Sequence, residues 1–324
     1  MSIDRFKPKI IVILGPTASG KSDLAVDIAL WFGSKQALKK FGINGAEIIS
    51  ADSRQVYKGL NIGSGKITKK EMKGVPHHLL DVASPKRIFT VSQYQKIARE
   101  AVEKILKTDK LPIVCGGAGL YIDSIIYGIK FPEVPPQKKL RKELEKLTTE
   151  ELFKKLQKLD RKRAKSIDKH NRRRLIRALE IITTTGKPVP LLPKNNPRDY
   201  AVLKIGVKKS PEQLKTLIKK RLSKRLKQGM IGEVENLHKN GAGWKRLDNL
   251  GLEYRYVSRY LRGIISKKEM TETLQKEIWR YAKRQMTWFK KDPSIYWVSS
   301  NKEAKSLMQK FLIGFVFSGL QNFF

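Results

Sequence analysis

Cysteine is the scarcest residue type in the sequence, with Cys115 as its single representative among 324 residues. One thiol excludes an intramolecular disulfide and a zinc site built on cysteines, and it fits a reducing compartment, so we expect a cytoplasmic protein. Long apolar runs are also missing. The apolar residues 311–324 fall short of the roughly 20 that a membrane helix needs. We expect them to form a terminal helix on the core without stable membrane association, a membrane anchor being the alternative.

Acidic residues are few compared with basic ones. The chain has 30 Asp and Glu against 68 Lys and Arg, which gives a formal net charge of +38. The excess is spread along the chain, and it predicts a polyanionic partner, with nucleic acid first and an anionic membrane surface second. The alternative is a proteome that is rich in lysine throughout.

Apolar segments alternate with amphipathic ones through the first part of the chain, which is typical of an α/β fold with a parallel sheet. Strands are expected at 9–15, 46–52 and 111–117, with 77–83 as a further candidate, and helices at 21–40 and 92–107. A proline-rich entry then leads into helical sequence without strands, and a strand returns at 200–208. We therefore expect an α/β core in two parts, 1–130 and 199–324, the second with C-terminal helices, and a helical insertion at 131–198.

The segment "GPTASGKS" follows the first strand and opens the first helix, which is the context that the phosphate-binding pattern G-x-x-x-x-G-K-[ST] requires. This pattern predicts a P-loop NTPase-like core. Backbone N–H groups and the helix N-terminus would hold a diphosphate, Lys21 would neutralise its charge, and the Ser22 hydroxyl would ligate Mg²⁺. A glycine-rich corner explains the glycines but not the Lys-Ser pair. The expected diphosphate-binding residues are Gly15, Pro16, Thr17, Ala18, Ser19, Gly20, Lys21 and Ser22.

The pattern alone does not name the reaction, and its usual occupants are ATP and GTP. An ATP-dependent kinase or NTPase acting on nucleic acid is therefore one hypothesis. Asp52 ends the second strand, at the edge where parallel sheets place their sites, and is the stronger candidate acid. Asp81, after "HHLL", reads equally well as a helix cap or a loop residue. His77 and His78 have no partner spacing that indicates a metal site.

Several longer segments, in order from residue 12 to about 298, together resemble the tRNA dimethylallyltransferase family: "GPTASGKS", "ADSRQVYKGLNIGSGK", "PHHLLDV", "GGAGLYI", "RRLIRALEI", "TGKP" and "YAKRQMTWF". The resemblance implies transfer of a dimethylallyl group from dimethylallyl diphosphate to the N6 amine of the adenosine 3′-adjacent to the tRNA anticodon. It also implies that the insertion grips the anticodon arm. One departure is Ala118, where the family usually has a hydroxyl residue.

The resemblance also assigns roles to single residues. Asp52 matches the base that takes a proton from the amine, Thr17 a residue at the bridging oxygen, and Arg221 a residue that reaches the diphosphate. Thr17 could instead serve the turn, and Arg221 lies among many other basic residues. Ser53, Gln55 and Tyr57 are expected on the adenine side, where the Gln55 amide would either read a base edge or stabilise its own loop.

Two amphipathic helical stretches carry basic faces, which suit a clamp on a folded RNA. Solvated surface faces are the alternative. Free adenine nucleotides as substrate would not need this charge, and the pairing of Lys21 with Asp52 argues against a non-enzymatic RNA-binding module. We expect a monomer. The residues predicted to contact tRNA from these faces are Arg173, Arg177, Arg280, Lys283 and Arg284.

Overall fold

The structure, a computed structural model, describes residues 7–190 and 199–314. The chain forms two compact units. The first comprises residues 1–128 and 197–324, and the second comprises residues 129–196. The unit boundaries lie within two residues of the expected limits of the helical insertion. Each unit has its own apolar core and is described separately.

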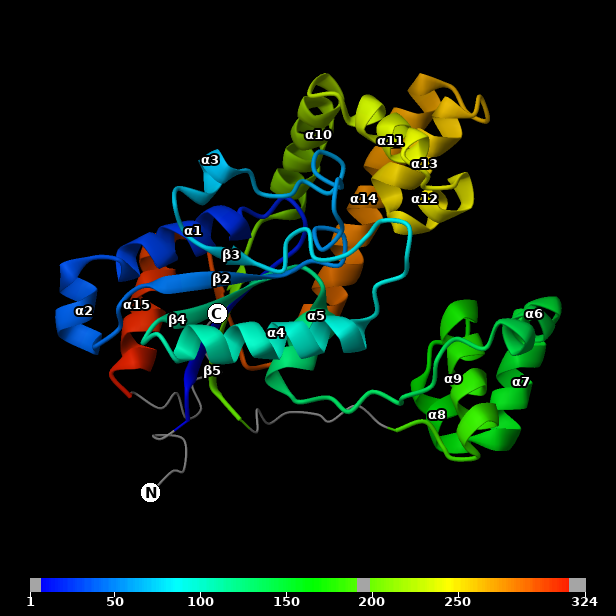
Figure 1. Cartoon of the computed structure of the whole chain (residues 1–324), viewed down its shortest axis with the longest axis horizontal. Coiled ribbons are helices and arrows are strands. Elements are labelled where there is room, and N and C mark those ends of the chain that lie inside the picture. The colour runs from blue at the N-terminus through cyan, green and yellow to red at the C-terminus, as the bar shows by residue number, and fades with distance from the viewer. Residues whose placement is uncertain (1–6, 191–198, 315–324) are drawn as a thin grey trace. The chain divides into compact units, whose positions relative to one another are not determined.

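The first unit is built on one sheet of six parallel strands in the order β3-β2-β4-β1-β5-β6 (Figure 1). The predicted strands at 9–15, 46–52, 111–117 and 200–208 are confirmed. The candidate at 77–83 pairs over only two residues, because Leu79 and Asp81 adopt positive φ and leave the extended conformation. The strands are β1 (Lys9–Leu14), β2 (Ala46–Ala51), β3 (His77–His78), β4 (Leu111–Gly116), β5 (Ala201–Val207) and β6 (Ile295–Val298).

Helices cover both faces of the sheet, which explains why its strands read as continuous apolar runs. Ile11 and Ile13 of β1 share one buried cluster with residues of α1 (Lys21–Phe32) and α15 (Asn301–Leu312). The helices α4 (Val91–Leu106) and α5 (Gly119–Ile126) pack against β2 and β4 and against each other. In Figure 1, α4 and α5 lie on the side of the sheet away from α1 and α15.

The predicted helix at 21–40 is interrupted. Gly33 ends α1, and the Ser34 hydroxyl accepts a hydrogen bond from the Ala37 N–H at the start of the next helix. The other helices of this unit are α2 (Lys35–Phe41), α3 (Lys69–Met72), α10 (Pro211–Lys227), α11 (Met230–Lys239), α12 (Trp244–Leu250), α13 (Leu252–Leu261) and α14 (Lys267–Phe289).

Within residues 129–190, the described part of the second unit, the regular elements are all helices, as the absence of strand patterns predicted: α6 (Lys138–Lys146), α7 (Thr149–Leu159), α8 (Arg161–Ser166) and α9 (Arg172–Thr185). Its core includes Leu152 and Leu156 of α7 and Leu175 and Leu179 of α9. These leucines recur at helical spacing, so α7 and α9 each bury one apolar stripe.

A buried carboxylate, Glu180 of α9, connects α9 to α6 and to the residue before α6. Burial opposes its ionisation, but hydrogen bonds from Arg141, Arg177 and the Gln137 N–H outweigh burial and lower the pKa of Glu180 to about 2. The helix-face interpretation placed Arg177 outward. Arg177 is instead half-buried, and it donates to Glu180 and to the Val134 carbonyl. Its contact with tRNA stays a prediction.

The C-terminal part of the described chain is a core helix. Ala304, Met308 and Leu312 of α15 are buried in the sheet cluster. The rest of the predicted terminal helix, residues 315–324, lies outside the described residues. Within residues 7–190 and 199–314, no helix combines the length and the apolar character needed to cross a membrane.

Candidate active site

The strand order brings the two sequence-predicted centres to one edge of the sheet. The segment 15–22, here called the phosphate turn, follows β1. Asp52 follows β2, and β4 lies between these two strands. This arrangement requires the backbone at the end of β4 to lie close to the end of β2. A Cβ atom at Gly116 would lie 2.1 Å from the Ala51 carbonyl oxygen, which only glycine avoids. The carboxyl ends of β1, β4 and β2 therefore form one compact edge.

The phosphate turn is held in a conformation that few residues adopt. Ala18 has φ +65° although it carries a Cβ atom, and Gly20, with φ +90°, precedes α1. The N-terminus of α1 has no side-chain cap, so its first N–H groups are left for an anion. Among the described residues, the buried Ser19 hydroxyl in this turn has no hydrogen-bond partner. Strain and uncapped donors in one turn indicate a ligand site.

Lys21 of the turn interacts electrostatically with two further cations, Arg221 and Arg225. Lys21 reaches back to the Pro16 carbonyl, with 3.2 Å between its Nζ and the oxygen. Burial lowers the pKa of Lys21, and the charges of Arg221 and Arg225 lower it further, whereas Cys115 and Asp52 oppose them. Burial and the neighbouring Arg225 lower the pKa of Arg221 to about 10. Arg221 is therefore near enough to Lys21 for the two charges to interact, and its contact with a diphosphate stays a prediction.

Asp52 is fixed by its own loop. Its Oδ1 accepts hydrogen bonds from the Arg54 N–H at 2.8 Å and from the Gln55 N–H at 3.3 Å. Asp52 is half-buried, and within the described part of the chain its Oδ2 receives neither of these bonds. The loop therefore holds this carboxylate through one oxygen, Oδ1, and the role of Asp52 as a base stays a prediction.

The residues after Asp52 serve the loop. The Gln55 amide accepts from the Ser50 hydroxyl and donates to the Gly65 carbonyl. Tyr57 is only 3% exposed, and its hydroxyl accepts a hydrogen bond from the Phe89 N–H. Ser53 is half-buried. Both side chains already have partners within the protein, and their assignment to tRNA stays a prediction.

The sequence analysis missed one residue of the site, Gln285. Its Oε1 accepts from the Thr17 N–H at 2.9 Å, and its Nε2 donates to the Gly117 carbonyl at 2.8 Å. The amide thus joins α14 to the phosphate turn and to the end of β4. A signal was present, because Gln285 is a polar residue in the apolar stripe that contains Ile278, Ala282 and Phe289. A buried polar side chain in such a stripe usually has fixed partners.

The last turn of α14 is anchored separately. Trp288 donates from its indole nitrogen to Asp123 Oδ2 at 3.2 Å, and a Cβ atom at Gly119 would lie 2.2 Å from the same nitrogen. Beyond the helix, Asp292 accepts from the buried Lys204 of β5 at 2.6 Å. These contacts hold α14 against α5 and β5, and therefore also hold Gln285 at the turn.

The basic face predicted on α14 is exposed. Arg280, Lys283 and Arg284 are all accessible, whereas Ile278, Ala282 and Phe289 are buried. Arg280 pairs with Glu277 of the same helix. In the second unit, Arg173 is exposed at the start of α9. The structure therefore leaves these cations available to a polyanion.

A metal site made by the protein alone does not occur in the described residues, which hold no cluster of three or more His, Cys, Asp or Glu side chains. The Ser22 hydroxyl lies at the start of α1, beside the Cys115 thiol, whose pKa burial raises to about 11. His78 pairs with Glu47, and His77 contacts the Val75 carbonyl, so both histidines have structural partners.

Comparison with known proteins decides the family. The family model described as IPP transferase matches residues 55–292. The chain belongs to the IPP transferase family. A tRNA dimethylallyltransferase of Thermoanaerobacter sp. (strain X514) is 41% identical over 321 residues, which cover 94% of this chain and 98% of the relative.

Solved structures agree with this membership. A tRNA isopentenylpyrophosphate transferase from Bacillus halodurans matches with a TM-score of 0.67 and 32% identity, over 95% of this chain and 96% of that one. A eukaryotic dimethylallyltransferase, solved acting on tRNA, is alike in fold, with a TM-score of 0.73 at 23% identity, over 94% of this chain and 80% of that one. The expected α/β fold with a parallel sheet is therefore confirmed, in an IPP transferase whose phosphate turn, Asp52 and basic helix lie in one unit.

Proposed function

We propose that this IPP transferase is a tRNA dimethylallyltransferase, which moves the dimethylallyl group of dimethylallyl diphosphate to the N6 amine of the adenosine 3′-adjacent to the anticodon. The observation that carries the proposal is the shared sheet edge, which holds the Asp52 carboxylate after β2 and, after β1, a strained turn whose Lys21 is electrostatically coupled to Asp52, Arg221 and Arg225. The names of the relatives support the same activity and do not favour an ATP-dependent kinase or NTPase.

The proposed chemistry is a substitution at the allylic carbon. The N6 nitrogen bonds to that carbon, the carbon–oxygen bond to the diphosphate breaks, and the diphosphate leaves with the bonding electrons. Asp52 takes the amine proton, which raises the electron density of a weak nucleophile as it attacks. The N–H groups of the turn, with Lys21 and Arg221, stabilise the charge that grows on the leaving group. Thr17 would contact the bridging oxygen.

Mg²⁺ fits the diphosphate side of this site. Magnesium is commonly held by one or two protein oxygens together with phosphate oxygens and water, and it does not require a protein cage. The hydroxyl of Ser22 supplies such an oxygen, and the described residues hold no competing carboxylate cluster. When bound, Mg²⁺ would neutralise part of the leaving-group charge.

We further propose that the exposed cations of α14 and α9 bind the phosphates of the anticodon arm, and that the target adenosine leaves its stack to reach Asp52. The enzyme would act as a monomer in the cytoplasm. The helical second unit would contribute Arg173, and Arg177 where its pairing with Glu180 permits.

The proposed activity is tested by asking which of two labelled donors transfers its label to tRNA. Unmodified tRNA is incubated with the full chain and labelled dimethylallyl diphosphate, or with γ-labelled ATP, and the tRNA nucleosides are analysed by mass spectrometry. We expect a gain of one dimethylallyl group on a single adenosine, from the prenyl donor only. Label that reaches RNA from ATP would contradict the proposal and support the kinase hypothesis.

The Asp52→Asn variant tests the base. It keeps the shape of the side chain and its acceptor for the Arg54 N–H, but it removes the proton acceptor, so we expect turnover to fall by about 10²-fold or more. Binding of tRNA, measured by filter retention, should be unchanged. Wild-type turnover in this variant would contradict the role of Asp52.

A further inference from the structure

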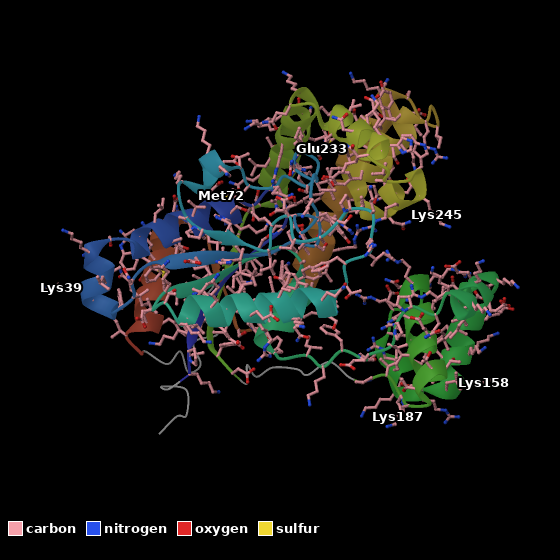
Figure 2. The ribbon with its side chains drawn as sticks, in the orientation of Figure 1. Lys39, Met72, Lys158, Lys187, Glu233 and Lys245 are labelled. Atoms are coloured by element: carbon pink, nitrogen blue, oxygen red, sulfur yellow. The ribbon has the colours of Figure 1, made fainter. Side chains whose placement is uncertain are left out.

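Residues 61–65, here called the bracket, form a loop between the arginines of α10 and the helix α11. On one side of the bracket, three successive backbone N–H groups point at a single carboxylate, Glu233 of α11 (labelled in Figure 2). Glu233 Oε2 accepts from the Asn61 N–H at 3.0 Å and the Ile62 N–H at 2.6 Å, and Oε1 accepts from the Gly63 N–H at 3.0 Å. The bracket is therefore anchored by its donors.

The other side of the bracket presents carbonyl oxygens to two arginines one helical turn apart. Arg225 donates to the Gly63 carbonyl at 3.1 Å, and Arg221 donates to the Gly65 carbonyl at 3.3 Å. A Cβ atom at Gly65 would lie 1.8 Å from Arg225 Nη2 and 2.4 Å from Arg221 Nη2. Both guanidinium groups thus lie directly against the bracket, which sets the direction in which they point.

The chemistry of Glu233 matches its position. An ionised carboxylate only accepts hydrogen bonds, and here it receives three N–H donors and the Tyr254 hydroxyl, which donates to Oε1 at 3.0 Å. Such charge-assisted bonds are about twice as strong as neutral ones. A glutamine of the same size would turn an NH₂ group towards one pair of these donors. Replacement by glutamine should therefore release the bracket without creating a cavity.

From these contacts we infer that Glu233 is a positioning residue: through the bracket, it holds Arg221 in the direction of the diphosphate. The inference rests on the proposed function, because it assumes that a diphosphate occupies the turn. Arg225 shares the bracket but is also paired with Glu253 at 3.1 Å, so it has a second support. Arg221 depends on the bracket more, since the Gly65 carbonyl is its hydrogen-bond partner within the described residues.

The experiment measures binding of inorganic pyrophosphate with Mg²⁺ to the full chain by calorimetry. We expect Glu233→Gln to weaken pyrophosphate binding about tenfold and to lower kcat for transfer by 10- to 100-fold, with KM for tRNA unchanged, because misplacement by about 1 Å carries losses of this size. Glu235→Gln, an exposed residue of the same helix paired with Lys239, is the matched control and should behave as wild type.

A double-mutant cycle separates positioning from general support of the fold. In the Arg221→Ala background, Glu233→Gln should cause no further loss of pyrophosphate affinity. An equal loss in both backgrounds, or wild-type affinity in Glu233→Gln alone, would overturn the inference. If Glu233→Gln does not fold, Glu233→Asp keeps the charge on a shorter side chain and should show a smaller loss that Arg221→Ala again removes. Failure of the wild-type chain to bind pyrophosphate would instead overturn the proposed function.

Discussion

Asp123 is a carboxyl group whose ionisation is made unfavourable by burial. Burial raises the pKa of Asp123 to about 6, although Lys204 and the hydrogen bond from Trp288 oppose it. A carboxyl group whose pKa is higher in the folded state destabilises the fold where it must ionise. The penalty is absent well below pH 4, grows between pH 4 and 6, and reaches about 2 to 3 kcal/mol above pH 6.

We therefore expect Asp123→Asn to raise the free energy of unfolding by about 2 kcal/mol at pH 7.5, a gain that shrinks towards zero as the pH falls below 4. The asparagine oxygen can still accept from Trp288. Urea unfolding of the variant and the wild type, at pH 7.5 and again below pH 4, measures the difference in the free energy of unfolding. Asp109→Asn, a change at an exposed loop residue, is the control. A gain that is equal at both pH values would show that ionisation is not its cause.

At the residue scale, the sequence pointed to the reacting groups of the candidate site but not to the residues that hold them. Lys21 follows from the phosphate-binding pattern, whereas the role of Asp52 and the choice of Arg221 came from the family resemblance, and all three roles stay predictions. Gln285 and Glu233 act on backbone groups that are distant in the chain, at separations of 268 and up to 172 residues. The sequence alone does not show which backbone group such a side chain contacts, because the two are far apart in the chain. The local signal is a polar residue within the apolar stripe of a helix.

At the scale of whole helices and strands, the sequence pattern predicted some elements correctly and missed others. The sequence predicted four of the strands because they are largely buried and therefore rich in apolar residues. It did not predict β6, whose four residues Ile295–Val298 are too few for a periodic pattern. The helix expected at 21–40 divides at Gly33, and the Ser34 cap that starts α2 is a signal that the continuous amphipathic pattern conceals.

The start of α5 provides a prediction at this scale. Ala118 occupies the N-cap position in extended conformation and supplies no cap hydrogen bond. The Ala118 carbonyl already accepts from the Tyr121 N–H at 2.9 Å, and a hydroxyl on the side chain would add an acceptor for the first turn of α5. We expect Ala118→Thr to raise the free energy of unfolding by about 1 kcal/mol relative to Ala118→Val, its equal in shape. Urea unfolding measures the difference. A rise in turnover without this gain would mean that the usual hydroxyl serves catalysis instead of capping.

For the molecule as a whole, the net charge of +38 has to be divided between cations that bind RNA and cations that only surround the protein. Each phosphate contact releases counterions, so its removal lowers the slope of log affinity against log salt concentration by about 0.7 to 0.9. A surface lysine that touches no RNA does not change that slope. The change in this slope when the cations of one surface are replaced therefore gives the number of phosphate contacts that the surface makes.

Two triple variants apply this count to the first unit. Replacing Arg280, Lys283 and Arg284 of α14 by alanine should lower the slope by about 2 and weaken tRNA binding at all salt concentrations. Replacing Lys35, Lys39 and Lys40 of α2, three exposed lysines of which Lys39 is labelled in Figure 2, removes the same charge and should leave the slope unchanged. Filter binding from 50 to about 300 mM salt measures both. Equal changes in the two variants would show that tRNA senses the total charge and not the face of α14.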